Sequence, residues 1–240
     1  MIDIHNHLLP GIDDGAPDVD TAVNLAKIAA ADGITHLVCT PHIYPGRYDN
    51  TLGTIAAAKQ IFEQALLTHG VDLKVSTAAE VRFDIEWMQA VTLGGIPMLG
   101  QWQGKKVLLL EFPHGAIPFA AERLTGWLIA QQIVPVIAHP ERNKGLLATP
   151  SKLKPFLEQG CLLQVTAGSV AGRFGRPVRK LVTDLLHQGV VTLMASDAHN
   201  VKYRPPVLTE GLEAAAKLIG DKEAYKLVHD NPWQIAKGHF

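Results

Sequence analysis

Short apolar runs alternate with longer helical stretches along almost the whole sequence, and this alternation constrains the fold more than any other feature. Seven runs are predicted to be strands, at residues 2–5, 36–40, 73–79, 106–111, 134–138, 161–166 and 191–195. Most are apolar throughout, as expected of parallel strands covered on both faces. Predicted helices at 18–31, 51–69, 151–159, 177–188 and within 209–230 separate or follow them, and several end at a glycine. The pattern predicts an α/β fold with parallel strands.

The chain length favours one domain that spans residues 1–240. A chain of 240 residues is long for an ordinary domain but normal for an α/β barrel. Seven strand–helix units therefore predict a distorted, TIM-like (β/α)7 barrel. An open doubly wound sheet is the alternative.

The composition narrows the class of protein. Hydrophobic residues make up 47% of the chain and charged residues 19%, which allows a substantial core. The formal net charge of −1 argues against a general nucleic-acid binder. We see neither a signal peptide nor an apolar run long enough for a membrane helix, so we expect a cytoplasmic protein without membrane insertion. Cys39 and Cys161 are too few for a disulfide scaffold and are expected to be buried thiols.

Polar residues of metal-binding types follow six of the seven predicted strands. In parallel α/β folds the carboxyl ends of the strands meet at one rim, where active sites form. The residues at these ends are His5, His7, His42, Glu80, Glu111, His139, Asp197 and His199. In His5-Asn6-His7, both imidazoles can point to the same side because strand side chains alternate. Any one of these residues alone would be unremarkable, but the set predicts a metal cluster, because buried charges must be paired or metal-bound.

Other polar residues near this rim have weaker signals. Asp13-Asp14-Gly15 reads as a turn, although Asp14 could add a carboxylate to the cluster. Arg142 and Arg204 lie next to the candidate ligands, and guanidinium groups suit an anionic substrate such as a phosphate. Either one could instead form a surface ion pair. Arg47, in the loop of residues 43–50, is a third candidate for substrate binding.

Several segments together resemble the PHP superfamily, and in particular its bacterial protein-tyrosine phosphatases of capsular and exopolysaccharide operons. The resemblance starts with the opening MIDIHNHLLPGIDDG. It continues, in order and spacing, with TPH at 40–42, AEV at 79–81, LEF at 110–112, HPER at 139–142 and SDAHN at 196–200. It covers essentially the whole chain. Asn6 stands where relatives often have serine, and the loop of residues 43–50 is individual, which leaves the choice of protein substrate open.

The resemblance implies a fold, a metal centre and an activity. The fold would be the distorted seven-unit barrel of the PHP superfamily, with a trinuclear metal centre. The implied ligands are His5, His7, Asp14, His42, Glu80, Glu111, His139, Asp197 and His199. Arg142 and Arg204 would bind the phosphate. The implied substrate is a phosphotyrosine-bearing protein, such as the tyrosine-rich tail of a bacterial tyrosine autokinase that controls capsule or exopolysaccharide synthesis.

The residues also predict a mechanism. Nine ligands exceed the needs of one ion, so we expect two or three divalent metals. The mixed imidazole and carboxylate set suits Mn²⁺, Fe or Zn²⁺, and the resemblance, to manganese-dependent enzymes, implies Mn²⁺ first. A hydroxide bridging the metals is expected to attack phosphorus in line. Cysteine-based chemistry is not expected, because no arginine follows Cys39 before Arg47 or Cys161 before Arg173.

Three other functions remain open at this stage. They are hydrolysis of histidinol phosphate or another small phosphomonoester, a polymerase-associated exonuclease, and a non-catalytic metal-binding regulatory module. Phosphotyrosine peptide, histidinol phosphate and single-stranded DNA, each assayed with Mn²⁺, would separate them.

Overall fold

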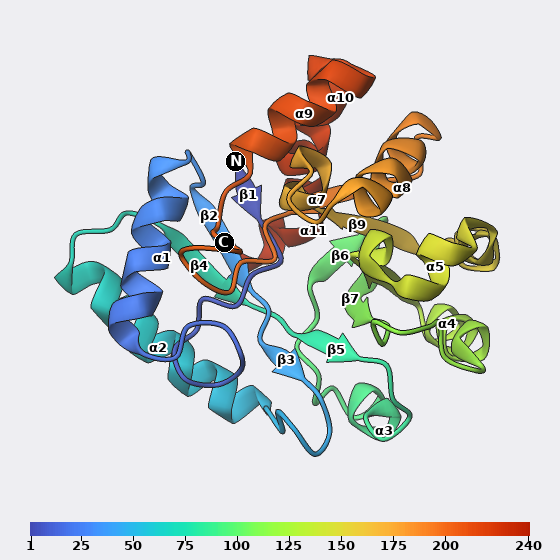
Figure 1. The fold of residues 1–240 in the computed structure, drawn as a ribbon. Helices are drawn as coiled ribbons and strands as arrows, with labels where there is room; N and C mark the ends of the chain where they lie inside the picture. The colour runs from blue at the N-terminus through green and yellow to red at the C-terminus, as the bar shows by residue number, and fades with distance from the viewer.

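A computed structural model describes residues 1–240 and arranges helices around a central set of strands (Figure 1). The strands are β1 (Ile2–Asp3), β2 (His36–Cys39), β3 (His42–Ile43), β4 (Lys74–Thr77), β5 (Glu80–Arg82), β6 (Gly100–Trp102), β7 (Lys105–Glu111), β8 (Ile133–Ala138), β9 (Leu162–Thr166) and β10 (Leu193–Ala195). The α-helices are α1 (Val19–Ala31), α2 (Leu52–Thr68), α3 (Met88–Thr92), α4 (Ala121–Ala130), α5 (Lys144–Ala148), α6 (Lys154–Glu158), α7 (Ala167–Ala171), α8 (Arg176–His187), α9 (Thr209–Ile219), α10 (Asp221–Val228) and α11 (Asp230–Ala236). Three short 3-10 helices complete the set: η1 (Pro140–Arg142), η2 (Pro150–Leu153) and η3 (Lys237–His239).

The strands form two sheets in which parallel pairing dominates. One sheet has the order β1-β2-β4, and the other has the order β10-β9-β8-β7-β5-β3. Every pair is parallel except β6, which adds to β7 in the antiparallel direction. This parallel pairing confirms the predicted α/β fold with parallel strands.

Backbone hydrogen bonds join the two sheets where the strands end. The amide of Asp197 donates to the His5 carbonyl at 2.8 Å, and the amide of His7 donates to the Ala198 carbonyl at 2.9 Å. β2 and β3 are consecutive parts of one extended segment that is interrupted at Pro41, which has no N–H to donate. β4 and β5 follow one another in the same way. The carboxyl ends of strands from both sheets are therefore held at one rim.

All seven predicted strands contain observed strand residues, but some elements were missed. α4 begins after Ala120, which has a left-handed backbone (φ 63°) and no side-chain cap, so the usual start signal is lacking. β6 begins at Gly100, a residue type depleted in strands. The helix expected at 151–159 is instead η2 followed by α6. In contrast, α1 and α2 begin where the sequence indicates, after the caps Asp18 and Thr51.

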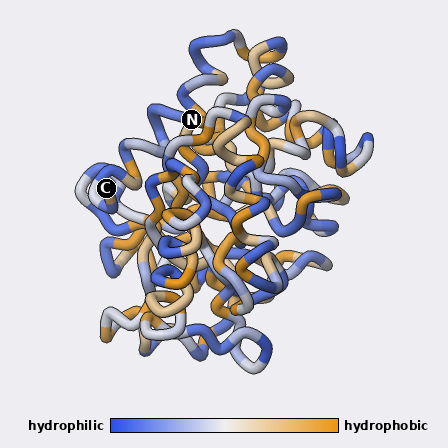
Figure 2. The backbone as a smooth tube through the Cα atoms, turned by 90° about the vertical axis from the view of Figure 1, so that its left-hand side faces the viewer, coloured by the Kyte–Doolittle hydropathy of each residue, from blue (hydrophilic) through white to orange (hydrophobic).

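Hydrophobic residues fill both sides of the sheets, as the segments coloured orange in the interior of Figure 2 show. Alternate residues of β7 serve two different clusters. Leu108 and Leu110 pack towards the helices, whereas Val107 and Leu109 join an inner cluster that includes Ile2, Val136 and Ile235. This division explains why the strands are apolar throughout. None of the helices combines the length and apolar character needed to cross a membrane.

Candidate metal centre

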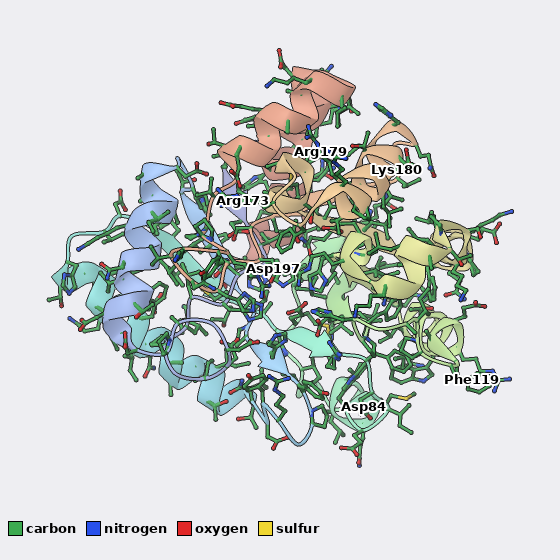
Figure 3. All side chains as sticks on the ribbon, in the orientation of Figure 1. Asp84, Phe119, Arg173, Arg179, Lys180 and Asp197 are labelled. Atoms are coloured by element: carbon green, nitrogen blue, oxygen red, sulfur yellow. The ribbon has the colours of Figure 1, made fainter.

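The nine candidate ligands lie together at the carboxyl ends of the strands. His42 lies in β3, Glu80 begins β5 and Glu111 ends β7. The others lie in the connections that follow β1, β8 and β10, namely His5, His7, Asp14, His139, Asp197 and His199. Asp197 lies near the centre of the view in Figure 3, inside the surrounding helices. All nine are buried except Asp14, whose side chain is 42% exposed.

Strand register and close backbone packing fix these positions. His42 and Glu80 are direct partners in the β3–β5 pair, and Arg82 is the partner of Glu111 in the β5–β7 pair. In the Asp13-Asp14-Gly15 turn, a Cβ on Gly15 would lie 2.0 Å from the His7 carbonyl oxygen, so only glycine fits. The turn thus brings Asp14 within 3.3 Å of His42 Nε2.

Eight of the candidates fall into three groups whose ligand atoms lie within 4.8 Å of one another. These groups are His7, Asp14, His42 and His199; His5, His7, Glu80 and Asp197; and His42, Glu80 and Glu111. The groups share His7, His42 and Glu80, as expected where neighbouring ions share ligands. The ninth candidate, His139, belongs to none of them, but its Nε2 lies 2.9 Å from Glu80 Oε1.

The buried polar atoms of the second group fit a bound metal. His5 Nε2, His7 Nε2, Glu80 Oε2 and Asp197 Oδ1 are buried and have no hydrogen-bond partner. They nevertheless face one another at 3.2–3.6 Å. Buried polar atoms without partners are costly, and a cation at their common centre would satisfy all of them. The donor set of imidazole nitrogens and carboxylate oxygens suits a divalent transition metal.

Three oxygen atoms whose role the sequence did not predict orient the imidazoles. The Nδ1 of His7 lies 2.7 Å from Asp13 Oδ2, and the Nδ1 of His5 lies 2.7 Å from Gln164 Oε1. The Nδ1 of His199 lies 3.0 Å from the Asp197 carbonyl. With Nδ1 engaged, each ring presents Nε2 to the cluster, a common arrangement at metal sites. A glutamine between the leucines and the valine of β9 was the available signal for Gln164, whereas Asp13 was indistinguishable from a turn residue.

Electrostatics set the charge of the central side chains. Burial raises the pKa of Glu80, but the charges of His5 and His42 outweigh it and hold that pKa well below its usual value. Burial, together with the charge of Arg142, lowers the pKa of His139 to about 3. Burial and the charge of His7 lower the pKa of His199 to about 4. An ionised Glu80 and neutral rings of His139 and His199 are the forms of these groups that bind metals. Burial lowers the pKa values of His5 and His7, but neighbouring carboxylates outweigh it and raise both, so a bound metal would have to deprotonate these two rings.

Two of the candidates have a strained backbone. His139 has φ 32° and Asp197 has φ 51°, both in the left-handed region that non-glycine residues rarely adopt. Such strain costs about 1–3 kcal/mol per residue and concentrates at functional sites. Here it turns each side chain towards the cluster within two residues of the end of a buried strand.

A cavity of about 190 Å³ opens onto the cluster. Seven candidate ligands and four arginines line it, and the arginines are Arg47, Arg82, Arg142 and Arg204. Arg142 and Arg204 both donate to Asp197 Oδ2. Their side chains are only 11% and 25% exposed. Neither therefore forms the surface ion pair that the sequence left open as the alternative to phosphate binding. The Nε of Arg204 is buried without a partner.

Two further arginines, Arg47 and Arg82, also line the cavity. Arg47 is exposed in the loop after β3, where the sequence placed it. Arg82 was missed, although it lies two residues after Glu80 on the same strand and therefore on the same side. Arg82 Nη1 lies 2.8 Å from Glu111 Oε2. His114 also lines the cavity, with Nδ1 3.8 Å from Glu111 Oε1.

Comparisons with known proteins agree on one group of relatives. Residues 1–237 match the model of the family described as capsular polysaccharide synthesis, CpsB/CapC. The tyrosine-protein phosphatase YwqE of Bacillus subtilis is 35% identical over 96% of this chain and 89% of its own length. The tyrosine-protein phosphatase CpsB of Streptococcus pneumoniae is 27% identical over 98% of each chain. A structure from the crystallographic work on YwqE and CpsB, described there as unique metal-dependent tyrosine phosphatases, superposes with a TM-score of 0.91 at 33% identity, covering 100% of this chain and 96% of the other.

Proposed function

The chain belongs to the CpsB/CapC family of capsular polysaccharide synthesis, and we propose that it hydrolyses phosphotyrosine in proteins at the metal cluster described above. It is a metal-dependent tyrosine-protein phosphatase, as its relatives are. The observation that carries the mechanism is the set of buried, unpartnered ligand atoms facing one another beneath an arginine-lined cavity.

We assign the metals to the three overlapping groups. His5, His7, Asp14, His42, Glu80, Glu111, His139, Asp197 and His199 would hold two or three ions between them. The mixed imidazole and carboxylate set supports Mn²⁺, with Fe or Zn²⁺ as alternatives. When bound, such ions supply Lewis acidity and lower the pKa of water from about 15.7 towards about 7, so that hydroxide is available near neutral pH.

The chain's own residues bind and orient the phosphate. Arg142 and Arg204 each use one nitrogen on Asp197 and keep further N–H donors for phosphoryl oxygens. The buried, unpartnered Nε of Arg204 supports this role. The pairing with Asp197 fixes both guanidinium groups before substrate arrives, so little reorganisation is needed as charge develops. A phenolate leaves with a pKa near 10 and so needs less protonation than an alkoxide.

The wider setting follows from the family. We propose a tyrosine autokinase of capsule or exopolysaccharide synthesis as the phosphoprotein substrate, supported by the family's description.

We take residues 1–240 as one PHP-type domain, and the match over residues 1–237 supports this. We also interpret the strands as a distorted (β/α)7 barrel, supported by the bridge between Asn6 and Ala198 that joins the ends of β1 and β10. Two free, buried thiols support a cytoplasmic location.

A chelation experiment with cysteine variants tests the proposed chemistry. EDTA should abolish hydrolysis of a phosphotyrosine peptide, and Mn²⁺ should restore it. Cys39→Ser and Cys161→Ser should keep turnover within about twofold of wild type. Burial raises the pKa of both thiols, that of Cys161 to about 12, so neither is a nucleophile. Turnover that survives chelation, or that is lost in a folded cysteine variant, would contradict a nucleophile supplied at the metal cluster.

A further inference from the structure

A short hairpin leads directly out of the candidate ligand His42 and forms part of the cavity wall. Tyr44 and Tyr48 form a backbone bridge, with the Tyr44 amide donating to the Tyr48 carbonyl at 3.0 Å and the Tyr48 amide donating back at 2.8 Å. Gly46 makes the turn with φ 75°, a left-handed conformation that favours glycine. The hairpin therefore has a defined conformation.

Side chains anchor this hairpin to the metal centre. Asn50 Nδ2 donates to the carbonyls of His42 and Ile12, both at 2.9 Å, which ties the hairpin to the loop that carries Asp14. The ring of Tyr48 stacks on the ring of His42, with centroids 5.7 Å apart and planes at 11°. The hairpin thus has a fixed position relative to the point where a phosphate would bind.

The hairpin presents one cation that differs from the other arginines of the cavity. Arg82, Arg142 and Arg204 are each paired with a carboxylate of the site. Arg47 is exposed and makes no ion pair. Its guanidinium lies 5.1 Å from the centroid of Tyr48 and 5.9 Å from that of Tyr44, within the range of cation–π contacts. The one carboxylate of the hairpin, Asp49, accepts instead from the Gly46 amide at 2.8 Å.

These contacts hold a free positive charge at the rim of the cavity. Stacking on two rings orients the guanidinium and reduces the side-chain freedom that it would lose on binding. A peptide whose phosphate reaches the cluster must cross this rim with the residues that flank its phosphotyrosine. We propose that Arg47 is a specificity residue that binds the carboxylate of an aspartate or glutamate flanking the phosphotyrosine. Such recognition presupposes the proposed phosphatase function.

Two phosphopeptides that differ only in the two residues flanking the phosphotyrosine test this role. Both carry one phosphotyrosine, and one has aspartates on either side of it where the other has asparagines. We expect wild type to have a kcat/KM roughly three- to tenfold higher for the acidic peptide, as for a partly exposed charge-assisted contact. Arg47→Gln should bring the ratio of the two peptides close to one. Because the contact is made to a flanking residue and not to the reacting phosphate, the change should fall mainly on KM for the acidic peptide. Arg47→Lys should restore part of the preference.

Arg123→Gln is the matched control, because Arg123 is exposed on α4, does not line the cavity, and its loss changes the net charge equally. It should leave the preference of wild type unchanged. Equal kcat/KM values for the two peptides in wild type, or a preference that persists in Arg47→Gln or disappears in Arg123→Gln, would overturn the role of Arg47. If wild type with Mn²⁺ hydrolyses neither peptide, nor p-nitrophenyl phosphate, the phosphatase function itself fails.

Discussion

Replacing Glu80 with glutamine is expected to lower phosphotyrosine hydrolysis by at least about 100-fold and to weaken metal binding. Glu80 Oε2 lies 3.2–3.3 Å from nitrogens of His5, His7 and His42, and Oε1 lies 2.9 Å from His139 Nε2. Glutamine keeps the shape but removes the negative charge and one acceptor. Loss of an outer group that only orients a ligand costs about 10–100-fold in metal affinity or activity, so the loss of a shared ligand should cost more.

Thermal unfolding gives a measurement of this effect that does not depend on turnover. A ligand that binds only the folded state raises the melting temperature according to its affinity. Adding Mn²⁺ to metal-free wild type should raise Tm, and the rise should be much smaller for Glu80→Gln. Glu122→Gln, an exposed position on α4, is the control and should behave as wild type. A Tm rise and turnover equal to wild type in Glu80→Gln would show that Glu80 is not a ligand.

Arg142→Ala and Arg204→Ala should each lower turnover by about 10²–10³-fold, the usual cost of losing one preorganised donor to a developing negative charge. Lysine at either position should recover only part of the activity, because an ammonium keeps the charge but loses the fork of donors. Wild-type rates in the alanine variants would refute a role in phosphate binding.

Stability and metal content separate this role from a structural one. Both arginines donate to the same buried Oδ2 of Asp197. Arg142→Ala should therefore destabilise the metal-free protein by up to about 3 kcal/mol, since a buried acceptor loses a charged donor. Arg204→Ala should cost less, because its side chain is more exposed. Loss of bound metal in either variant would instead make the residue a positioning group for Asp197.

The sequence predicted the ends of the strands better than the remainder of the fold. Hydrophobic runs and glycine stops depend on local chemistry, and they located all seven predicted strands. The candidate ligands could be found because parallel strands deliver their last residues to one rim. α4 lacks a capping residue and β6 begins at a glycine, so no local pattern indicated either.

Contacts between distant residues set the rest of the site. Asp13 accepts from the Gly15 amide within its turn, as a turn residue would, but its second role of orienting His7 depends on an approach of 2.7 Å that spacing does not encode. The pairing of Gln164 with His5 joins residues 159 positions apart. Likewise, Arg142 is buried against Asp197, which a backbone hydrogen bond to the distant His5 holds in place.

Counting the metal ions tests the metal cluster most directly. Metal-free wild type would be titrated with Mn²⁺, and bound metal and phosphotyrosine-peptide turnover would be measured at each step. Three ligand groups that share His7, His42 and Glu80 predict at least two ions per chain, with turnover rising as they bind. Saturation at one ion or fewer per chain, with no further rise in turnover as Mn²⁺ is added, would contradict the assignment.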